Sequence, residues 1–109
     1  MSYDATLAAR IRSLLSERDD VTERKMFGGL AFLVGGNLAV AASGQGGILV
    51  RCDPAATDDH IVDGAEPMIM RGRSMNGWLR VSDEGVADEV GLAHWVRIGA
   101  ATAASLPAK

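Results

Sequence analysis

Residues 26–50 read MFGGLAFLVGGNLAVAASGQGGILV, a run of 25 residues without a charge that decides the fold. On length alone such a run could span a bilayer. Its breakers are grouped, however, at Gly35-Gly36-Asn37 and from Ser43 to Gly47, where glycines supply the positive φ angles of tight turns. The two groups cut the run into pieces of strand length, so we expect strands over 30–34, 38–42 and 48–51 in place of a membrane helix.

The sequence on either side of this run completes a pattern of helices and strands. Leu7, Ile11, Leu14 and Leu15 recur at helical spacing and predict a helix over 3–18. The other expected elements are a strand over 21–26, a helix from Asp53-Pro54 to about Val62, strands over 67–70 and 77–82, and a helix over 86–105.

The order is therefore α-β-β-β-β-α-β-β-α in a single domain, residues 1–109. Short glycine turns can join only antiparallel neighbours, because a parallel connection needs a long crossover. The expected fold class is α+β: an antiparallel sheet with helices on one side.

Composition narrows the class of protein. A hydrophobic share of 48% in 109 residues is typical of one globular domain. The net charge of −3 argues against nucleic acid as a partner, although a compact basic patch could still bind it. The N-terminal residues lack the apolar region of a signal peptide, so we expect a cytoplasmic protein that does not insert into a membrane.

No group of residues in the sequence predicts catalysis. The glycine loops match neither dinucleotide-binding nor Walker patterns, so turns explain them better. Cys52 is the single cysteine, and a structural, partly buried role is far commoner than a nucleophilic one, although a helix start at Pro54 would favour its thiolate. His60 and His94 have no histidine or cysteine partner at helical spacing. We therefore predict no catalytic, cofactor-binding or metal-binding residues and no enzyme.

Charges are segregated in the second half of the chain. Residues 53–66 carry five acids and no base, whereas residues 67–82 carry three arginines and no acid. The acids of the first segment could neutralise the arginines of the second within the protein. We favour that interpretation, but an anionic partner remains the alternative.

The three arginines could form one patch. Asn76-Gly77 predicts a two-residue hairpin turn, and a longer loop from Gly72 is the alternative. With the turn at Asn76-Gly77, Arg73 lies opposite Arg80, and Arg71 and Trp78 share their face. Like charges that face each other across a strand pair are unfavourable unless an anion lies between them. The candidate contact for a partner or anion is therefore the set Arg71, Arg73, Arg80 and Trp78.

Several blocks of sequence carry a family resemblance. They are Arg24-Lys25-Met26-Phe27-Gly28-Gly29 with Leu30-Ala31-Phe32-Leu33 and Gly36-Asn37, then Gly72-Arg73, Met75, Gly77-Trp78 and Trp95-Val96. From Tyr3 to Pro107 the chain resembles the TfoX N-terminal-domain family (TfoX is also called Sxy), and it looks like a stand-alone N-terminal domain.

The resemblance carries implications for fold and function. It implies an α+β fold of the type also seen in secretion chaperones. The family is named for a regulator of natural competence for DNA uptake, thought to act alongside a transcription activator, so a regulatory or protein-interaction role is implied. The full competence regulators carry a second, C-terminal domain, which makes the competence role itself a weaker expectation. The family has no catalytic residue set.

Three functions stay open after this reasoning. The favoured one is a non-enzymatic regulatory or protein-interaction domain with an unknown, transcription-related protein partner. The alternatives are a DNA-binding accessory domain and a small enzyme or ligand-binding protein that uses Cys52. A homodimer through exposed strand edges is a further expectation.

Overall fold

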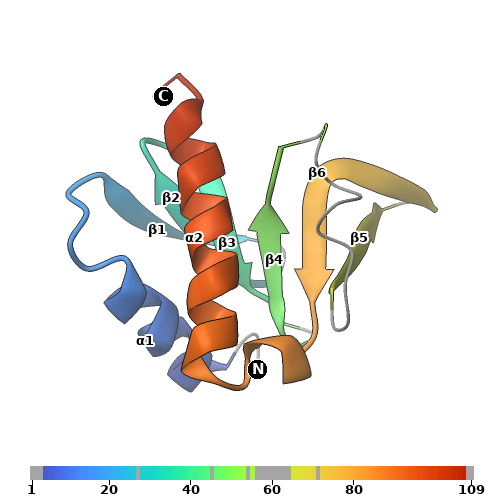
Figure 1. Cartoon of the computed structure of the whole chain (residues 1–109), viewed down its shortest axis with the longest axis horizontal. Coiled ribbons are helices and arrows are strands. Elements are labelled where there is room, and N and C mark those ends of the chain that lie inside the picture. Colours follow the sequence, from blue (N-terminus) through green and yellow to red (C-terminus); the bar gives the residue numbers. More distant parts are fainter. Residues whose placement is uncertain are drawn as a thin grey trace.

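The computed structural model describes residues 4–26, 28–44, 46–53, 55, 65–70 and 72–107, without the side chains of residues 26, 67–70 and 73–76. Figure 1 shows its helices and strands. In chain order they are α1 (Ala5–Leu14), β1 (Val21–Met26), β2 (Gly29–Val34), β3 (Asn37–Ala42), β4 (Ile48–Arg51), β5 (Ala65–Met70), β6 (Arg73–Val81), the 3-10 turn η2 (Glu84–Val86) and α2 (Glu89–Ser105). The α+β class is confirmed. Most of the helix expected between residues 53 and 62 lies outside the described residues.

The six strands form one antiparallel sheet in the spatial order β1-β2-β3-β4-β6-β5. The uncharged run forms β2, β3 and β4, as expected from its grouped breakers. Gly35 and Gly36 have φ angles of 60° and 84°, which other residues adopt only with strain. Among the described helices, none is long and apolar enough to cross a membrane.

The hairpin of β5 and β6 corrects one expectation. Met70 pairs with Arg73, so the turn falls between them and not at Asn76-Gly77. The pairing shifts between Pro67 and Met68, where residues 76–78 of β6 have no partner in β5 and form a bulge, with Gly77 at a φ of 87°. A glycine that suits a tight turn suits a β-bulge equally well, and sequence pattern does not separate the two.

The two helices cover the same face of the sheet (Figure 1). Ile11 of α1, Phe32 of β2 and Leu92 of α2 have no exposed surface and belong to one large apolar cluster between the layers. The other face of the sheet carries a second, smaller cluster of Ala31, Leu33, Ala41 and Leu49. Burial of this kind is the main source of the stability of the fold.

The position of α2 is fixed at two points that matter for the site described below. Gly99 packs directly on β3, since a Cβ atom there would lie 2.3 Å from the carbonyl oxygen of Ala39. At the end of the helix, the Nδ2 of buried Asn37 donates hydrogen bonds to the carbonyl oxygens of Pro107, at 2.9 Å, and Ala103, at 3.5 Å. The last turn of a helix leaves carbonyls without intrahelical partners. Asn37 of β3 bonds one carbonyl of that turn, at Ala103, and the carbonyl of Pro107 just after the helix.

An ion pair joins α1 to β1. Arg12 donates two hydrogen bonds to Glu23, from Nε at 2.6 Å and from Nη2 at 2.8 Å. These bonds hold the pKa of the Glu23 carboxyl below its ordinary value of 4.5. Because the pKa is lower in the folded state, the stabilisation is fully present above the unfolded value and is lost as the pH falls through the folded value.

We expect the variant Glu23→Gln to lack this acid-dependent loss. Both side chains are partly exposed, so the difference should be at most about 1 kcal/mol. Urea unfolding of wild type and variant, measured from neutral pH to below pH 4.5, tests this. Stability curves that stay parallel over that range would contradict the assignment.

Candidate functional site

Arg51 and Trp78 form a cross-strand pair where β4 ends. They are directly opposed in the β4–β6 register, and the Cζ of Arg51 lies 5.0 Å from the centroid of the Trp78 ring. Both side chains are partly buried. Stacking of a guanidinium on an indole is favourable and leaves the edge of the guanidinium available to an acceptor.

Within the described residues, the guanidinium of Arg51 is incompletely hydrogen-bonded. Its Nε is buried and meets no hydrogen-bond acceptor in the described part of the chain. Other arginines find carboxylates: Arg10 pairs with Glu89 at 3.0 Å, and Arg18 with Asp20 at 3.4 Å. A buried donor without an acceptor is rare in folded proteins, because it loses its hydration without compensation.

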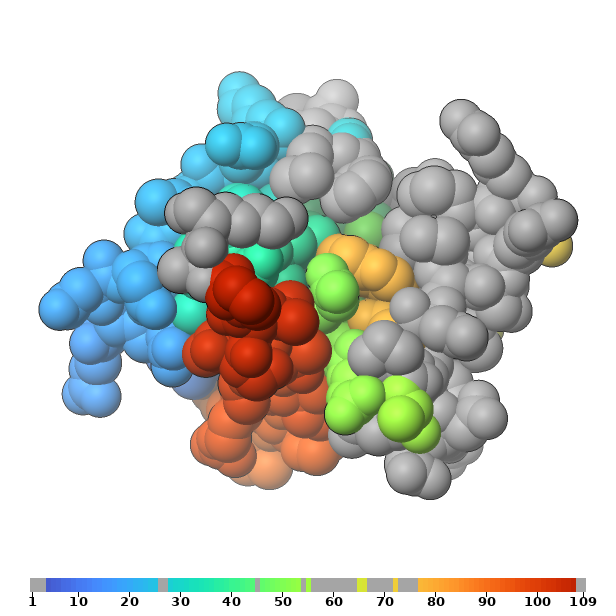
Figure 2. Space-filling model, turned by 90° about the horizontal axis from the view of Figure 1, so that it is seen from above, coloured from blue at the N-terminus to red at the C-terminus, as the bar shows by residue number. Residues whose placement is uncertain are grey.

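A hollow of about 380 Å³ lies beside Arg51, between the end of β4 and the C-terminal part of α2. Figure 2 shows these two segments, with β6 next to them, at one end of the molecule. The hollow is lined by Arg51, Asp53, Ala101, Thr102, Ser105 and Leu106.

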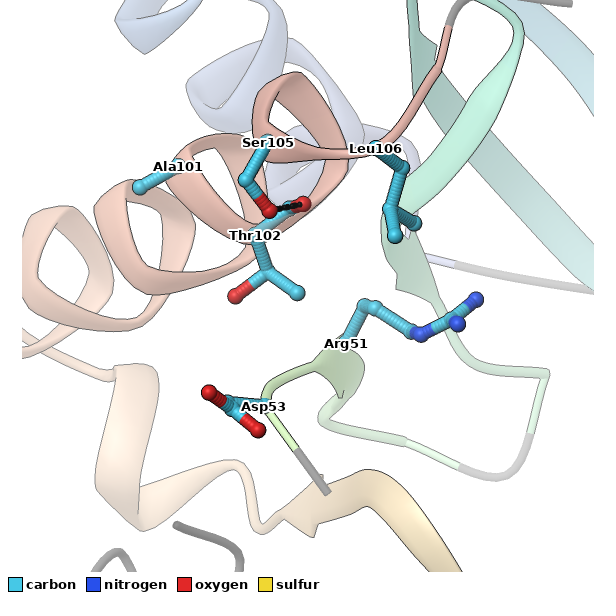
Figure 3. Close-up of a pocket in the computed structure, with 6 residues that line it drawn as sticks. All are labelled: Arg51, Asp53, Ala101, Thr102, Ser105 and Leu106. Atoms are coloured by element: carbon cyan, nitrogen blue, oxygen red, sulfur yellow. Dashed lines mark hydrogen bonds between the residues drawn. The ribbon is translucent and has the colours of Figure 1, made fainter. Parts of the chain in front are cut away.

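The two ends of this hollow differ in charge. In Figure 3 the stem of Arg51 runs along it and the guanidinium lies on the side of Leu106, whereas Asp53 lies on the opposite side. Asp53 accepts the backbone N–H of Ala55 at 2.9 Å through Oδ1. The hollow therefore has a cationic end and an anionic end.

The hydroxyl groups in the wall are already used as donors. The Thr102 hydroxyl donates to the carbonyl oxygen of Ile98 at 2.9 Å, and the Ser105 hydroxyl donates to that of Thr102 at 2.6 Å. Each then offers lone pairs to the hollow. Arg51 is consequently the principal hydrogen-bond donor among the side chains that line it.

The predicted arginine patch is only partly visible in the structure. Arg71 and the side chain of Arg73 lie outside the described residues. The expected register is wrong, because Arg80 lies opposite Glu66 of β5 and Arg73 lies opposite Met70. The shift follows from the true position of the turn. Trp78, the fourth member, packs against Arg51.

Arg80 has a structural contact with the β3–β4 turn. Its Nη1 donates to the Ser43 hydroxyl and its Nη2 to the Gly46 carbonyl oxygen, both at 3.2 Å. Asp83 also holds this turn, since its Oδ1 accepts the Gly47 N–H at 2.7 Å. Arg80 thus helps to position the turn, and it also lines a small hollow with Glu66.

Cys52 lies in the core. Its side chain has no exposed surface, and its backbone N–H donates to the Gly77 carbonyl oxygen at 2.8 Å. Cys52 is thus buried more completely than the partly buried position expected from the sequence. Within the described ranges, no group of three or more histidine, cysteine, aspartate or glutamate side chains could hold a metal ion.

Burial predicts a slow thiol. We expect Cys52 in the native protein to react with a thiol reagent at least about a hundred-fold more slowly than in urea-unfolded protein, because reaction requires opening of the core. A control with Ala104→Cys on the exposed side of α2, made in a Cys52→Ala background, should label rapidly. Fast labelling of native wild type would contradict the buried assignment.

Sequence reasoning missed Arg51 and the hollow. Arg51 is the first charge after the uncharged run, which is a signal, but its importance depends on Trp78 of β6. When the hairpin turn is placed at Asn76-Gly77, the sequence does not show that Trp78 pairs with Arg51 of β4. The contribution of Thr102 and Ser105 depends on the packing of α2, which the sequence does not specify.

Comparison with known proteins places the chain in a family. The model of the TfoX N-terminal domain matches residues 13–103 of the 109. In comparisons with curated proteins and with solved structures, nothing matched. The family match spans most of the sequence, including every strand of the sheet and nearly all of α2. The chain belongs to the TfoX N-terminal domain family.

Proposed function

We propose that the protein is a non-enzymatic regulatory domain that binds a protein partner through the end formed by β4, β6 and the C-terminal part of α2. The observation that carries the proposal is the Arg51–Trp78 stack, in which a partly buried indole supports a guanidinium whose Nε has no acceptor among the described residues. Tryptophan and arginine are the residues most enriched at the energetic centres of protein interfaces.

The surroundings of the stack support the same function. A hollow beside a rigid aromatic and arginine pair offers a place for a partner side chain. The site stands on ordered elements, because Gly99 and Asn37 fix α2 against β3. A transcription-related or competence-related partner, which the family resemblance implies, is the proposed setting for this binding.

Affinity capture with matched variants tests the proposal. Wild type, Trp78→Ala and Arg24→Ala would be immobilised after circular dichroism has shown that each is folded, and bound proteins from a cell extract would be quantified. Arg24 is an exposed residue of β1 and serves as the control. We expect at least one protein that wild type and Arg24→Ala retain and Trp78→Ala loses. An identical set of proteins on all three would overturn the proposal.

A further inference from the structure

We infer that the Arg51 end of the hollow binds a carboxylate side chain of the partner, and that the hollow itself takes an adjacent apolar side chain. The ligand is thus an acidic–apolar motif of a protein. This inference rests on the proposed function, since it names the chemistry that the same surface recognises.

The orientation of Arg51 and its lack of an acceptor among the described residues indicate a carboxylate ligand. Trp78 orients the guanidinium by stacking. The arginine side chain therefore loses less conformational entropy when it binds a ligand. The Nε is buried without an acceptor, and the salt bridges among the described residues do not include Arg51. Since the Nε itself is enclosed, a ligand is met by the terminal nitrogens Nη1 and Nη2. These nitrogens bind a carboxylate with two parallel hydrogen bonds that are stronger than bonds between neutral groups.

The apolar neighbour follows from the size and lining of the hollow. Its volume of about 380 Å³ is within the range of ligand-binding clefts and has room for an aliphatic side chain. Leu106, Ala101 and the aliphatic stem of Arg51 supply apolar surface. The Thr102 and Ser105 hydroxyls can accept a backbone N–H of the ligand, because their own hydrogens are engaged in α2.

Two features favour a singly charged carboxylate over a phosphate group. Asp53 places a negative charge at the far end of the hollow. The C-terminal end of α2, which has no basic residue in its last turn, adds the negative end of the helix dipole. Both repel a multiply charged anion more strongly than a carboxylate. Each phosphodiester of a nucleic acid is singly charged, but its closely spaced neighbours add to the same repulsion, so a protein ligand is favoured over a nucleic-acid backbone.

Two small probes test the ligand chemistry. N-acetyl-Glu-Leu-amide and its neutral analogue N-acetyl-Gln-Leu-amide would be titrated into the isotope-labelled protein, with NMR shifts of the Trp78 indole and of the backbone amides of residues 101–106 as readout. We expect saturable shifts with the glutamate probe and about ten-fold weaker binding of the glutamine probe. Equal binding of the two probes, or a short DNA duplex that shifts these signals when the glutamate probe does not, would overturn the inference.

Two variants should change the affinity for the glutamate probe in opposite directions. Arg51→Gln should weaken the glutamate probe by about ten-fold and leave the glutamine probe unchanged. Asp53→Asn should bind the glutamate probe more tightly, because it removes a like charge while asparagine still accepts the Ala55 N–H. Unchanged binding of the glutamate probe in both variants would overturn the inference.

The outcomes also separate this inference from the proposed function. If Trp78→Ala loses a captured protein while neither probe discriminates Arg51→Gln from wild type, the interaction surface stands and the carboxylate assignment fails. If Trp78→Ala keeps every captured protein, the proposed function fails, whatever the probes do.

Discussion

Phe32→Ala is expected to destabilise the domain by about 3–5 kcal/mol. Phe32 has no exposed surface and, among the residues whose side chains are described, is the largest fully buried one of the core between the sheet and the two helices. Its removal takes away buried apolar surface and leaves a cavity, and both effects lower the free energy of unfolding. Because domains of this size are stable by only about 5–15 kcal/mol, the variant should be close to unfolding at ambient temperature.

Urea unfolding followed by circular dichroism checks this result. Leu38→Ala is the matched control, since Leu38 lies on the neighbouring strand β3 and is only partly buried against the smaller cluster. It should lose no more than about half as much free energy of unfolding as Phe32→Ala. Similar losses in the two variants would show that the layer between helices and sheet is not the main core.

Gly99→Ala has the second largest expected effect on stability. Whether it stabilises or destabilises the domain tests the packing of α2 on β3. Alanine is a better helix former than glycine by about 1 kcal/mol, so helix propensity alone predicts stabilisation. A Cβ at position 99 would, however, lie 2.3 Å from the Ala39 carbonyl oxygen and 3.0 Å from its carbon. These are backbone atoms of β3 that cannot turn aside, so α2 must lift from the sheet.

We therefore expect Gly99→Ala to be destabilised by about 2 kcal/mol or more. Ala101→Gly, on the exposed side of the same helix, should lose about 1 kcal/mol through propensity alone. Thermal and urea unfolding of both variants measure the comparison. A Gly99→Ala protein more stable than wild type would contradict the close approach of α2 to β3. It would also argue against the conclusion that the packing of α2 on β3 fixes the wall of the hollow.

The fold could be predicted where local chemistry leaves few choices. Gly35-Gly36-Asn37 joins two uncharged strands of equal length, and the turn lies there. The amphipathic pattern around Ile11 correctly indicates the first helix, and the helix expected over 86–105 is α2. In each case the hydrophobic periodicity and the turn-forming residues predict the same element, and the two signals together determine its type and position.

The candidate site could be predicted only in part, for a physical reason. Gly72 and Gly77 both take positive φ angles, and a local pattern cannot decide which one forms the turn. The choice is made by pairing with β4, a long-range contact. That choice determines the neighbours of Trp78, and so moves its partner from the predicted patch of Arg71, Arg73 and Arg80 to Arg51 of β4.

The most direct test of the central claim is a site-specific crosslink. A photo-reactive amino acid at position 101, in the exposed wall of the hollow, would be compared with the same amino acid at position 17, where Glu17 is exposed beyond the end of α1. After illumination in cells, we predict a discrete crosslinked protein from position 101, absent from position 17 and lost when Arg51→Gln is added. No product from position 101, or the same products from both positions, would contradict the claim that this end of the molecule binds a protein.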